Sequence, residues 1–221
     1  WASSSSNAFA VGDTGTVAHY DGASWQEMTV PVASDLDVTA VWGLREDQVY
    51  AVGENGTLLI FDGSAWSAVT HSYHPYFTGV WAAGPEEVIL VGDGGVYGYD
   101  GSGIDLRAFD PGWWLWDVWG SSDSDIFAVG ELGLILHYDG VAWSEMDSGT
   151  EQTLNAVWGS SPENVFAVGN GGVILRFDGD AWSPLASGTE IDLKDVHGAN
   201  DVDIYVVAFG STLLRYTKRS Q

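Results

Sequence analysis

Short apolar runs alternate with glycine-rich turns along the whole chain, and the same order of runs recurs about every 39 residues. Each unit begins with an apolar run containing a V-W-G motif or a variant of it. The tryptophan of this motif stands at positions 1, 42, 81, 119 and 158, and His197 takes the sixth place. No segment has the 3.6-residue period of an amphipathic helix. The pattern therefore predicts an all-β protein made of repeats.

Three more strands follow the first in each unit, so we label the four a to d. Strand b ends in a motif of the A-V-G type, at residues 9–12, 50–53, 89–92, 127–130 and 166–169. The G-x-x-G pattern after it predicts a two-residue hairpin with positive φ. Strand c ends in aromatic-Asp-Gly, at residues 20–22, 61–63, 99–101, 138–140 and 177–179. Strand d opens with Trp25, Trp66, Trp143 or Trp182.

Four short strands in 39 residues is the arrangement of a β-propeller blade. We predict a single propeller domain over residues 1–221, with units at about 1–37, 38–76, 77–114, 115–153, 154–192 and 193–221. Six blades, the last one incomplete, use every strand and give about 22 to 24 strands. Five and seven blades are the alternatives. Where the ring closes, unpaired backbone edges would remain, and a second chain or another segment could pair with them.

The run from Gly169 to Trp182 reads G-x-x-G-x-(I/L)-L-x-(Y/F)-D-G-x-x-W in its general form, and it resembles the Asp-box (BNR) repeats of sialidase-type propellers. The A-V-G motif at residues 167–169 and the S-G-T motifs at residues 148–150 and 187–189 are most similar to those of the Ycf48-like group of photosystem II assembly factors. The resemblance covers essentially the whole chain. It implies a propeller fold and, by analogy, a protein partner.

The chain is strongly acidic, with 31 acidic and seven basic residues and a formal charge of −24. Such a surface repels phosphate backbones and anionic headgroups, so nucleic acid is excluded as a partner and membrane binding is disfavoured. It favours cations, neutral sugars or a basic protein. No apolar run is long enough for a membrane span, so we expect no membrane insertion. Only Lys194 and Lys218 are lysines, which suits an extracellular or periplasmic protein, although no signal segment is present in this chain.

The absence of cysteine removes disulfides, thiolate metal sites and cysteine nucleophiles together. The motifs that recur in every blade are interpreted as architecture: the turn aspartate accepts backbone N–H groups, and the tryptophan packs between blades. The histidines and arginines of strand c, at positions 19, 137, 176 and 215, are expected on blade flanks.

Two segments break the repeat, residues 71–77 and residues 110–116, and both connect strand d to the next strand a. These connections share a face with the b–c hairpins. One equivalent position of these hairpins is acidic in most units: Asp13, Glu54, Asp93 and Glu131, with Asn170 in the fifth. Aromatic faces beside carboxylates suit a sugar, although the aromatic residues could instead only fill a wide channel or cover an irregular third blade. The candidate ligand-binding residues are His71, Tyr73, His74, Tyr76, Trp113, Trp114, Trp116, Asp13, Glu54, Asp93 and Glu131.

These residues favour a non-enzymatic, secreted module that recognises a glycan or a protein through the b–c and d–a face. The alternative is a carbohydrate-active enzyme, a glycoside hydrolase or lyase, that pairs Glu54 with Asp93 or Asp93 with Glu131. A sialidase is disfavoured because at least two of the five arginines lie on strand c. We assign no catalytic residue, no metal site and no cofactor. His71, His74 and Asp93 have the right ligand types for zinc, but their spacing is weak evidence for it.

Overall fold

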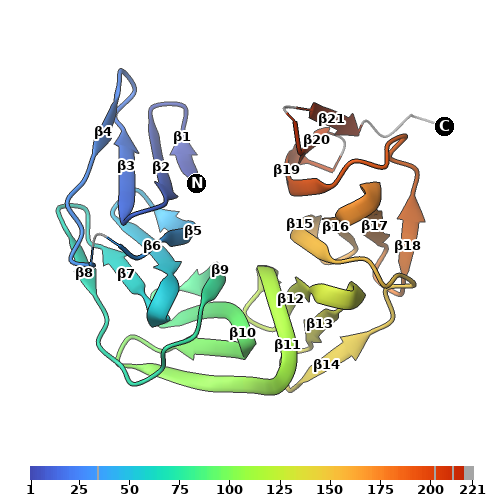
Figure 1. Ribbon diagram of the computed structural model, residues 1–221, viewed down its shortest axis with the longest axis horizontal. Helices are drawn as coiled ribbons and strands as arrows, with labels where there is room; N and C mark the ends of the chain where they lie inside the picture. The colour runs from blue at the N-terminus through green and yellow to red at the C-terminus, as the bar shows by residue number, and fades with distance from the viewer. Residues whose placement is uncertain (34, 202, 211, 217–221) are drawn as a thin grey trace. The chain divides into compact units, whose positions relative to one another are not determined.

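The structure is a computed structural model that describes residues 1–33, 35–201, 203–210 and 212–216. These residues form 21 strands and three short 3₁₀ turns, with no α-helix among them. The chain divides into two compact units, Trp1–Gly112 and Trp113–Gln221, which we describe one at a time (Figure 1). The all-β prediction is confirmed, while the expected 22 to 24 strands exceed the number found.

The first unit contains two complete four-stranded antiparallel sheets and the start of a third. The first sheet consists of β1 (Ala2–Ser4), β2 (Asn7–Gly12), β3 (Thr16–Tyr20) and β4 (Trp25–Glu27). The second consists of β5 (Val38–Arg45), β6 (Gln48–Gly53), β7 (Leu58–Phe61) and β8 (Trp66–Ala68). Next come β9 (Phe77–Gly84), β10 (Glu87–Tyr99) and the first part of β11 (Ile104–Ser122). Sequential strands are neighbours in each sheet, as in a propeller blade.

The second unit repeats this order with the end of β11 followed by β12 (Asp125–Gly130), β13 (Ile135–Tyr138) and β14 (Trp143–Met146). A four-stranded sheet follows, formed by β15 (Leu154–Ser161), β16 (Asn164–Gly169), β17 (Ile174–Phe177) and β18 (Trp182–Leu185). The last sheet has three strands, β19 (Leu193–Asn200), β20 (Asp203–Ala208) and β21 (Thr212–Tyr216). The last blade was expected to be incomplete, and the described residues up to Tyr216 give it three strands.

The described strands form five sheets, so the prediction of six blades is wrong and the alternative of five holds. The reason lies in the third repeat, whose strands do not separate. β10 runs through both strand b and strand c, and β11 runs from strand d of the third repeat into strand a of the fourth (Figure 1). The third and fourth repeats therefore share one six-stranded sheet.

Strand b of the interior sheets is buried on both faces. In β6, Val49 and Ala51 pack toward Phe9 and Val17 of the first sheet. The alternate residues of β6, Tyr50 and Val52, belong to a second cluster with Phe77, Val80 and Leu90 of β9 and β10. Side chains alternate between the two faces of a strand, so an apolar residue at every position stacks sheet upon sheet.

The b–c hairpins of the first, second, fourth and fifth repeats are two-residue turns with positive φ, as predicted. In the second repeat, Asn55 and Gly56 have φ of 53° and 73°, and the amide of Thr57 donates to the carbonyl of Glu54. Positive φ at both central residues defines a type I′ turn, whose twist matches that of the strands it joins. Leu132 in the fourth repeat and Thr14 in the first adopt the same conformation.

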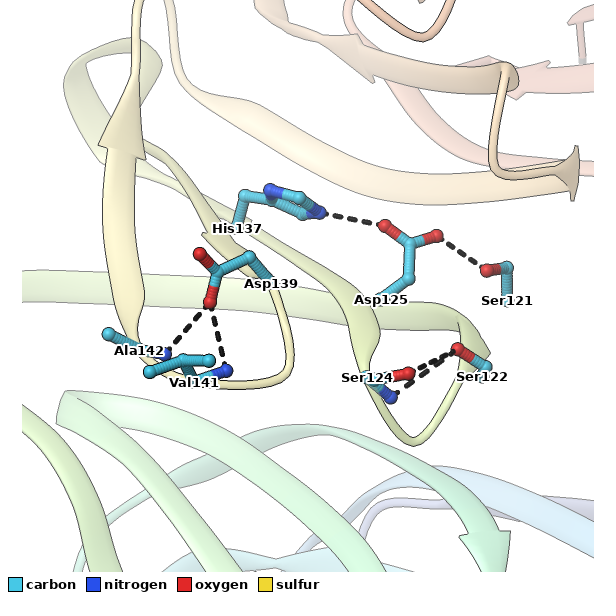
Figure 2. A network of polar contacts seen from close by, with 8 residues as sticks. All are labelled: Ser121, Ser122, Ser124, Asp125, His137, Asp139, Val141 and Ala142. Atoms are coloured by element: carbon cyan, nitrogen blue, oxygen red, sulfur yellow. Dashed lines mark hydrogen bonds and ion pairs between the residues drawn. The ribbon is translucent and has the colours of Figure 1, made fainter.

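The Asp-Gly turns between strands c and d are also built as the sequence predicts. The Asp139 carboxylate accepts the amides of Val141 and Ala142, both at 2.9 Å, and Gly140 has φ of 87° (Figure 2). Asp62 makes the corresponding contacts to the amides and hydroxyl of its own turn. These hydrogen bonds favour the charged carboxylate and lower the pKa of Asp62 to about 2.

The strand d tryptophans differ in how far they are buried between sheets. Trp66 and Trp182 are buried and meet the rings of Phe9 and Phe127 edge-on at 5.9 Å. Trp143 is only half-buried, against Tyr138 of its own sheet, so the expected burial of this strand d tryptophan between blades is wrong. Trp25 is exposed. The predicted packing between sheets is therefore observed only where the structure places a phenylalanine opposite the tryptophan.

Candidate functional site

A strap of chain lies against the b–c hairpin in the second, fourth and fifth repeats, and its composition differs in the second. In the fourth and fifth repeats the strap is the S-G-T motif. A Cβ at Gly133 would lie 2.0 Å from the carbonyl oxygen of Thr150, and a Cβ at Gly172 would lie 2.0 Å from that of Thr189. In the second repeat, residues 71–75 take this place, and the Gly56 amide donates to the carbonyl of Pro75 at 2.7 Å. The segment that breaks the repeat therefore substitutes for the S-G-T strap.

His71 fastens this strap through both ring nitrogens. Its Nδ1 lies 3.2 Å from the amide of Tyr73, which can only donate, so Nδ1 is the acceptor. Nε2 lies 2.6 Å from the carbonyl of Gly56, which can only accept, so Nε2 carries the hydrogen. These contacts define a neutral imidazole with a structural role. His71 therefore shapes the candidate site more than it offers a free group to a ligand.

An open hollow of about 270 Å³ lies beside this strap in the first unit. Three segments line it: the connector between β4 and β5, the second b–c hairpin, and the chain from the end of β8 to His74. The lining residues include Pro31, Val32, Leu36, Val69, Tyr73 and His74. Three of the predicted site residues (His71, Tyr73 and His74) are thus brought to one hollow, and the described residues that line it include no carboxylate and no Lys or Arg.

The ring of Tyr73 packs edge-on against Tyr97 at 5.7 Å, and Tyr97 in turn contacts Phe77 at 5.3 Å. Tyr73 is half-buried, whereas His74 is exposed. Aromatic packing therefore holds Tyr73 in place in the lining of the hollow, whereas the side chain of His74 is exposed to solvent.

Acidic side chains of the first unit accept hydrogen bonds from backbone amides of neighbouring loops. Glu54 Oε2 accepts the amide of Asp37 at 3.1 Å, and Asp37 Oδ1 accepts the amide of Thr14 at 2.9 Å. Asp93 Oδ1 accepts the amide of Tyr76 at 2.7 Å. The sequence identified Glu54 and Asp93 from their repetition, but only the structure shows that their carboxylates bind backbone amides.

The pKa of the Tyr76 phenol indicates that several of these acids lie near its ring. Its pKa is raised, first by burial and then by the negative charges of Glu54, Asp37 and Asp13. Two predicted site residues, Asp13 and Glu54, therefore share a negatively charged region with Tyr76 in the first unit. Asp37 belongs to it as well and was missed by the sequence analysis, because it lies in a connector outside the repeated motifs.

The predicted site residues of the second unit are differently placed. Trp113, Trp114 and Trp116 lie in strand β11, so the expectation of a loop there is wrong: residues 110–116 continue strand d directly into strand a. All three are half-buried. Trp113 Nε1 donates to Glu145 Oε1 at 3.3 Å, and the rings of Trp114 and Trp116 lie 6.0 Å apart. Glu131 is exposed at the fourth b–c hairpin.

Asp117 in the second unit is a chemically unusual residue that the sequence analysis passed over. Its Oδ2 accepts the amide of Val157 in the next sheet at 2.9 Å, and its Oδ1 accepts the amide of Val118. Burial raises its pKa to about 7, and the charge of Asp195 acts in the same direction. The signal was available, because the equivalent positions in three other repeats are Ala40, Gly79 and Ala156.

A serine, an aspartate and a histidine also line up in the fourth repeat, but not as a nucleophilic triad. His137 Nε2 and Ser121 Oγ both bond to the carboxylate of Asp125 (Figure 2). A triad needs the histidine between serine and aspartate, so that the imidazole can take the hydroxyl proton. His137 stacks on Phe127 at 4.4 Å, and His19 stacks on Phe9 at 4.6 Å. Both histidines are thus flank residues of strand c, as predicted.

Among the described residues, no three histidine, aspartate or glutamate side chains come together in a way that could hold a metal ion. No helix in the described part of the chain is both long and apolar enough to cross a membrane.

The repeated antiparallel sheets, each with sequential strand order, define a β-propeller. Solved structures support this class over the whole chain. The protein is similar to "YCF48 from Cyanidioschyzon merolae", with a TM-score of 0.75 and 14% identity, over 97% of this chain and 78% of that one. It is also similar to the structure "YCF48 bound to D1 peptide", with a TM-score of 0.53 and 16% identity, over 98% and 91% of the two chains.

A third similar structure is the C-terminal WD40 domain of Sif2, with a TM-score of 0.69 and 10% identity, over the whole of this chain and 68% of that domain. At these identities the similarity establishes the propeller fold and not a family. No family model matches the sequence, and no curated protein does. The predicted resemblance to Ycf48 is confirmed at the level of fold, while membership of the Asp-box group stays a prediction.

Proposed function

We propose that this protein is a non-enzymatic binding module that holds a segment of another protein in the hollow of the first unit. The observation that carries the proposal is the replacement of the S-G-T strap by residues 71–75, because this replacement borders an open, largely apolar hollow on the loop face. Loops that a rigid sheet scaffold holds in place are where propellers and similar folds most often bind ligands.

The charge around the hollow indicates what kind of segment fits. Residues 1–112 contain fifteen Asp or Glu residues and only two arginines. Both arginines pair with neighbouring aspartates, Arg45 with Asp47 and Arg107 with Asp105. The partner segment is therefore expected to combine apolar side chains, which enter the hollow, with lysine or arginine near Asp13, Asp37 and Glu54. An extracellular or periplasmic setting belongs to the same proposal.

The comparison with solved structures supports a protein partner over a glycan. One of the similar propellers is described as bound to a peptide. Among the first-unit aromatic residues that would face a sugar, Tyr73 is engaged with Tyr97 and His71 is engaged with backbone. Two of the carboxylates named for a carbohydrate-active enzyme, Glu54 and Asp93, accept backbone amides.

The test is a peptide array of equal-length sequences that vary in net charge and apolar content, with the purified chain as probe. We expect binding to apolar peptides that carry basic residues, and weaker binding as salt rises, because exposed charges are screened. The variant Ala33→Trp places an indole in the hollow, since Ala33 lines it. It should weaken binding by at least about tenfold, which corresponds to about 1.4 kcal/mol.

The matched control is Ala142→Trp, which adds the same indole at an exposed turn outside the hollow. It should bind as the unmodified chain does. Equal binding by Ala33→Trp would remove the hollow from the proposal, and an array without any bound peptide would refute a protein partner. Binding to a glycan panel in place of peptides would support the glycan version, and turnover on that panel would support the enzyme.

A further inference from the structure

The strap of the second repeat, residues 71–75, has a histidine where the straps of the fourth and fifth repeats have a serine. His71, Ser148 and Ser187 each stand ten residues before the V-W-G tryptophan or the histidine that replaces it. Each side chain accepts the backbone amide two residues ahead. Ser148 Oγ lies 3.3 Å from the amide nitrogen of Thr150, and His71 Nδ1 lies 3.2 Å from that of Tyr73. The histidine therefore has the structural role of the serine, with a different side-chain chemistry.

The second strap lies on its hairpin glycine in the same way as the others. A Cβ at Gly56 would lie 2.4 Å from the carbonyl oxygen of Tyr73, much as a Cβ at Gly133 would lie 2.0 Å from that of Thr150. The imidazole of His71 contacts the same glycine, because Nε2 lies 2.6 Å from the Gly56 carbonyl oxygen. His71 thus takes part in two of the hydrogen bonds that hold the strap, one to the hairpin and one within the strap.

Protonation of His71 removes one of these two hydrogen bonds and keeps the other. Nε2 already carries a hydrogen, so an added proton binds Nδ1, whose N–H then faces the N–H of Tyr73. Two donors cannot bond to each other, and turning the ring over does not help, since both nitrogens of an imidazolium are donors. The bond from Nε2 to the Gly56 carbonyl becomes charge-assisted and therefore stronger. The expected effect is local, because the ring stays on the hairpin while the backbone of Tyr73 is released.

The neighbours of His71 leave histidine as the residue type that ordinarily changes charge between pH 5 and 8. The rings of Tyr73 and Phe77 lie 6.2 and 6.4 Å from its own, and β9, which contains Phe77, has no titratable residue. Burial raises the pKa of Tyr76 and of Tyr97, away from this range. Carboxylates ordinarily titrate at about pH 4, below this range. The titratable residues of the strap and of the segments beside it are Asp35, Asp37, Glu54, Tyr73, His74, Tyr76, Asp93 and Tyr97.

Release of Tyr73 would change the hollow that this residue lines. Its ring is half-buried against Tyr97, and its backbone is tied to His71. An imidazolium also brings a positive charge to a lining that is expected to accept a segment with basic residues. Both effects act in the same direction and weaken the binding of such a segment in acid.

We propose that His71 is a pH-sensitive residue that holds the strap when neutral, and that its protonation frees the Tyr73 backbone and releases the partner from the hollow. The substitution of serine by histidine carries the argument, since a serine hydroxyl keeps its acceptor lone pairs over the whole range in which imidazole titrates. The release of a partner rests on the proposed function, whereas the loosening of the strap does not.

Amide hydrogen exchange measured by NMR tests the loosening without any partner. After division by the intrinsic exchange rate at each pH, the Tyr73 amide should be at least about tenfold less protected at pH 5 than at pH 8. The Thr150 amide, which Ser148 holds, is the internal control and should keep its protection. His71→Ser gives this strap the serine of the other straps and should remove the pH dependence of Tyr73. Equal protection of Tyr73 at the two pH values in the unmodified chain would overturn the proposal.

The matched variant is His74→Gln, which removes the exposed histidine of the same strap. It should keep the pH response of Tyr73, and loss of this response would assign it to His74 and overturn the proposal. If His71→Ser fails to fold by circular dichroism, the carbon-bound ring protons of His71 decide the question in the His74→Gln chain. The protection of Tyr73 should fall over the pH range in which these signals shift, and a fall in another range would overturn the proposal.

Peptide binding tests the regulation. The tightest histidine-free peptide of the array should bind His74→Gln at least about tenfold more weakly at pH 5 than at pH 8, a change of about 1.4 kcal/mol. The double variant with His71→Ser should bind it equally at both. Equal pH dependence of the two chains, or loss of Tyr73 protection without weaker binding, would overturn the release of the partner. An array without a bound peptide would refute the proposed function, and the protection of Tyr73 would still decide whether His71 holds the strap.

Discussion

The indole of Trp119 lies directly against Gly159 in the next sheet, so closely that a Cβ on Gly159 would stand 2.6 Å from the ring carbon Cη2. The same relationship joins Trp158 to Gly198, and Trp1 to Gly43 in the first unit. In these three pairs the tryptophan of one sheet packs where the glycine of the following sheet leaves room, whereas the third repeat has Ala82 at this position. The sequence predicted that these tryptophans form the core, and the structure identifies what each of them contacts.

Gly159→Ala should destabilise the fold by about 1 to 3 kcal/mol, the usual cost of overpacking a tight interior. Urea unfolding followed by tryptophan fluorescence measures the change. Gly84→Ala is the matched control, because a Cβ at Gly84 meets no atom within 4 Å. Equal stability of the two variants would show that the indole of Trp119 moves aside without cost.

Trp182→Ala should cost about 3 to 5 kcal/mol of unfolding free energy, since it empties a buried site between two sheets. Trp25→Ala removes the same side chain from an exposed position and should change stability by less than about 1 kcal/mol in the monomer. Both values come from chemical unfolding. A loss at Trp25 as large as that at Trp182 would mean that its ring is buried in solution.

Asp117 should make stability depend on pH near neutrality. Its folded-state pKa of about 7 lies above its ordinary value of 3.8, so the folded state holds a proton that the unfolded state releases. Stability from this group is therefore full below about pH 4 and falls as pH rises to about 7. Asp117→Asn should flatten this slope, measured by urea unfolding at several pH values. An unchanged slope would assign it to other groups, of which Asp195, whose pKa burial also raises, is the nearest candidate.

Strand β21 should exchange its amide hydrogens faster than β17. The two strands occupy the same place in successive sheets, but β18 covers β17, whereas β21 is the last strand of its sheet in the described chain. Hydrogen exchange read by mass spectrometry over Leu213–Tyr216 and Ile174–Phe177 compares them directly. Equal protection in a monomer would show that some other strand completes the last sheet.

The sequence by itself determined the repeat, most of its strands and its turns, because each depends on residues close together in the chain. Asn55-Gly56 specifies a type I′ turn through its own φ angles, and Asp139 closes a turn with amides two and three residues ahead. Such features need no knowledge of the rest of the molecule.

Only the tertiary structure decided the number of sheets and what the singled-out residues do. The sequence could not show that β11 would continue through residues 110–116 as one strand. The hydrogen bond from the Asp37 amide to the Glu54 carboxylate joins residues 17 apart in the sequence, and that from the Val157 amide to the Asp117 carboxylate joins residues 40 apart. Whether a carboxylate binds a partner or holds backbone depends on which distant amide folding places beside it, and the periodicity of a single repeat does not contain that information.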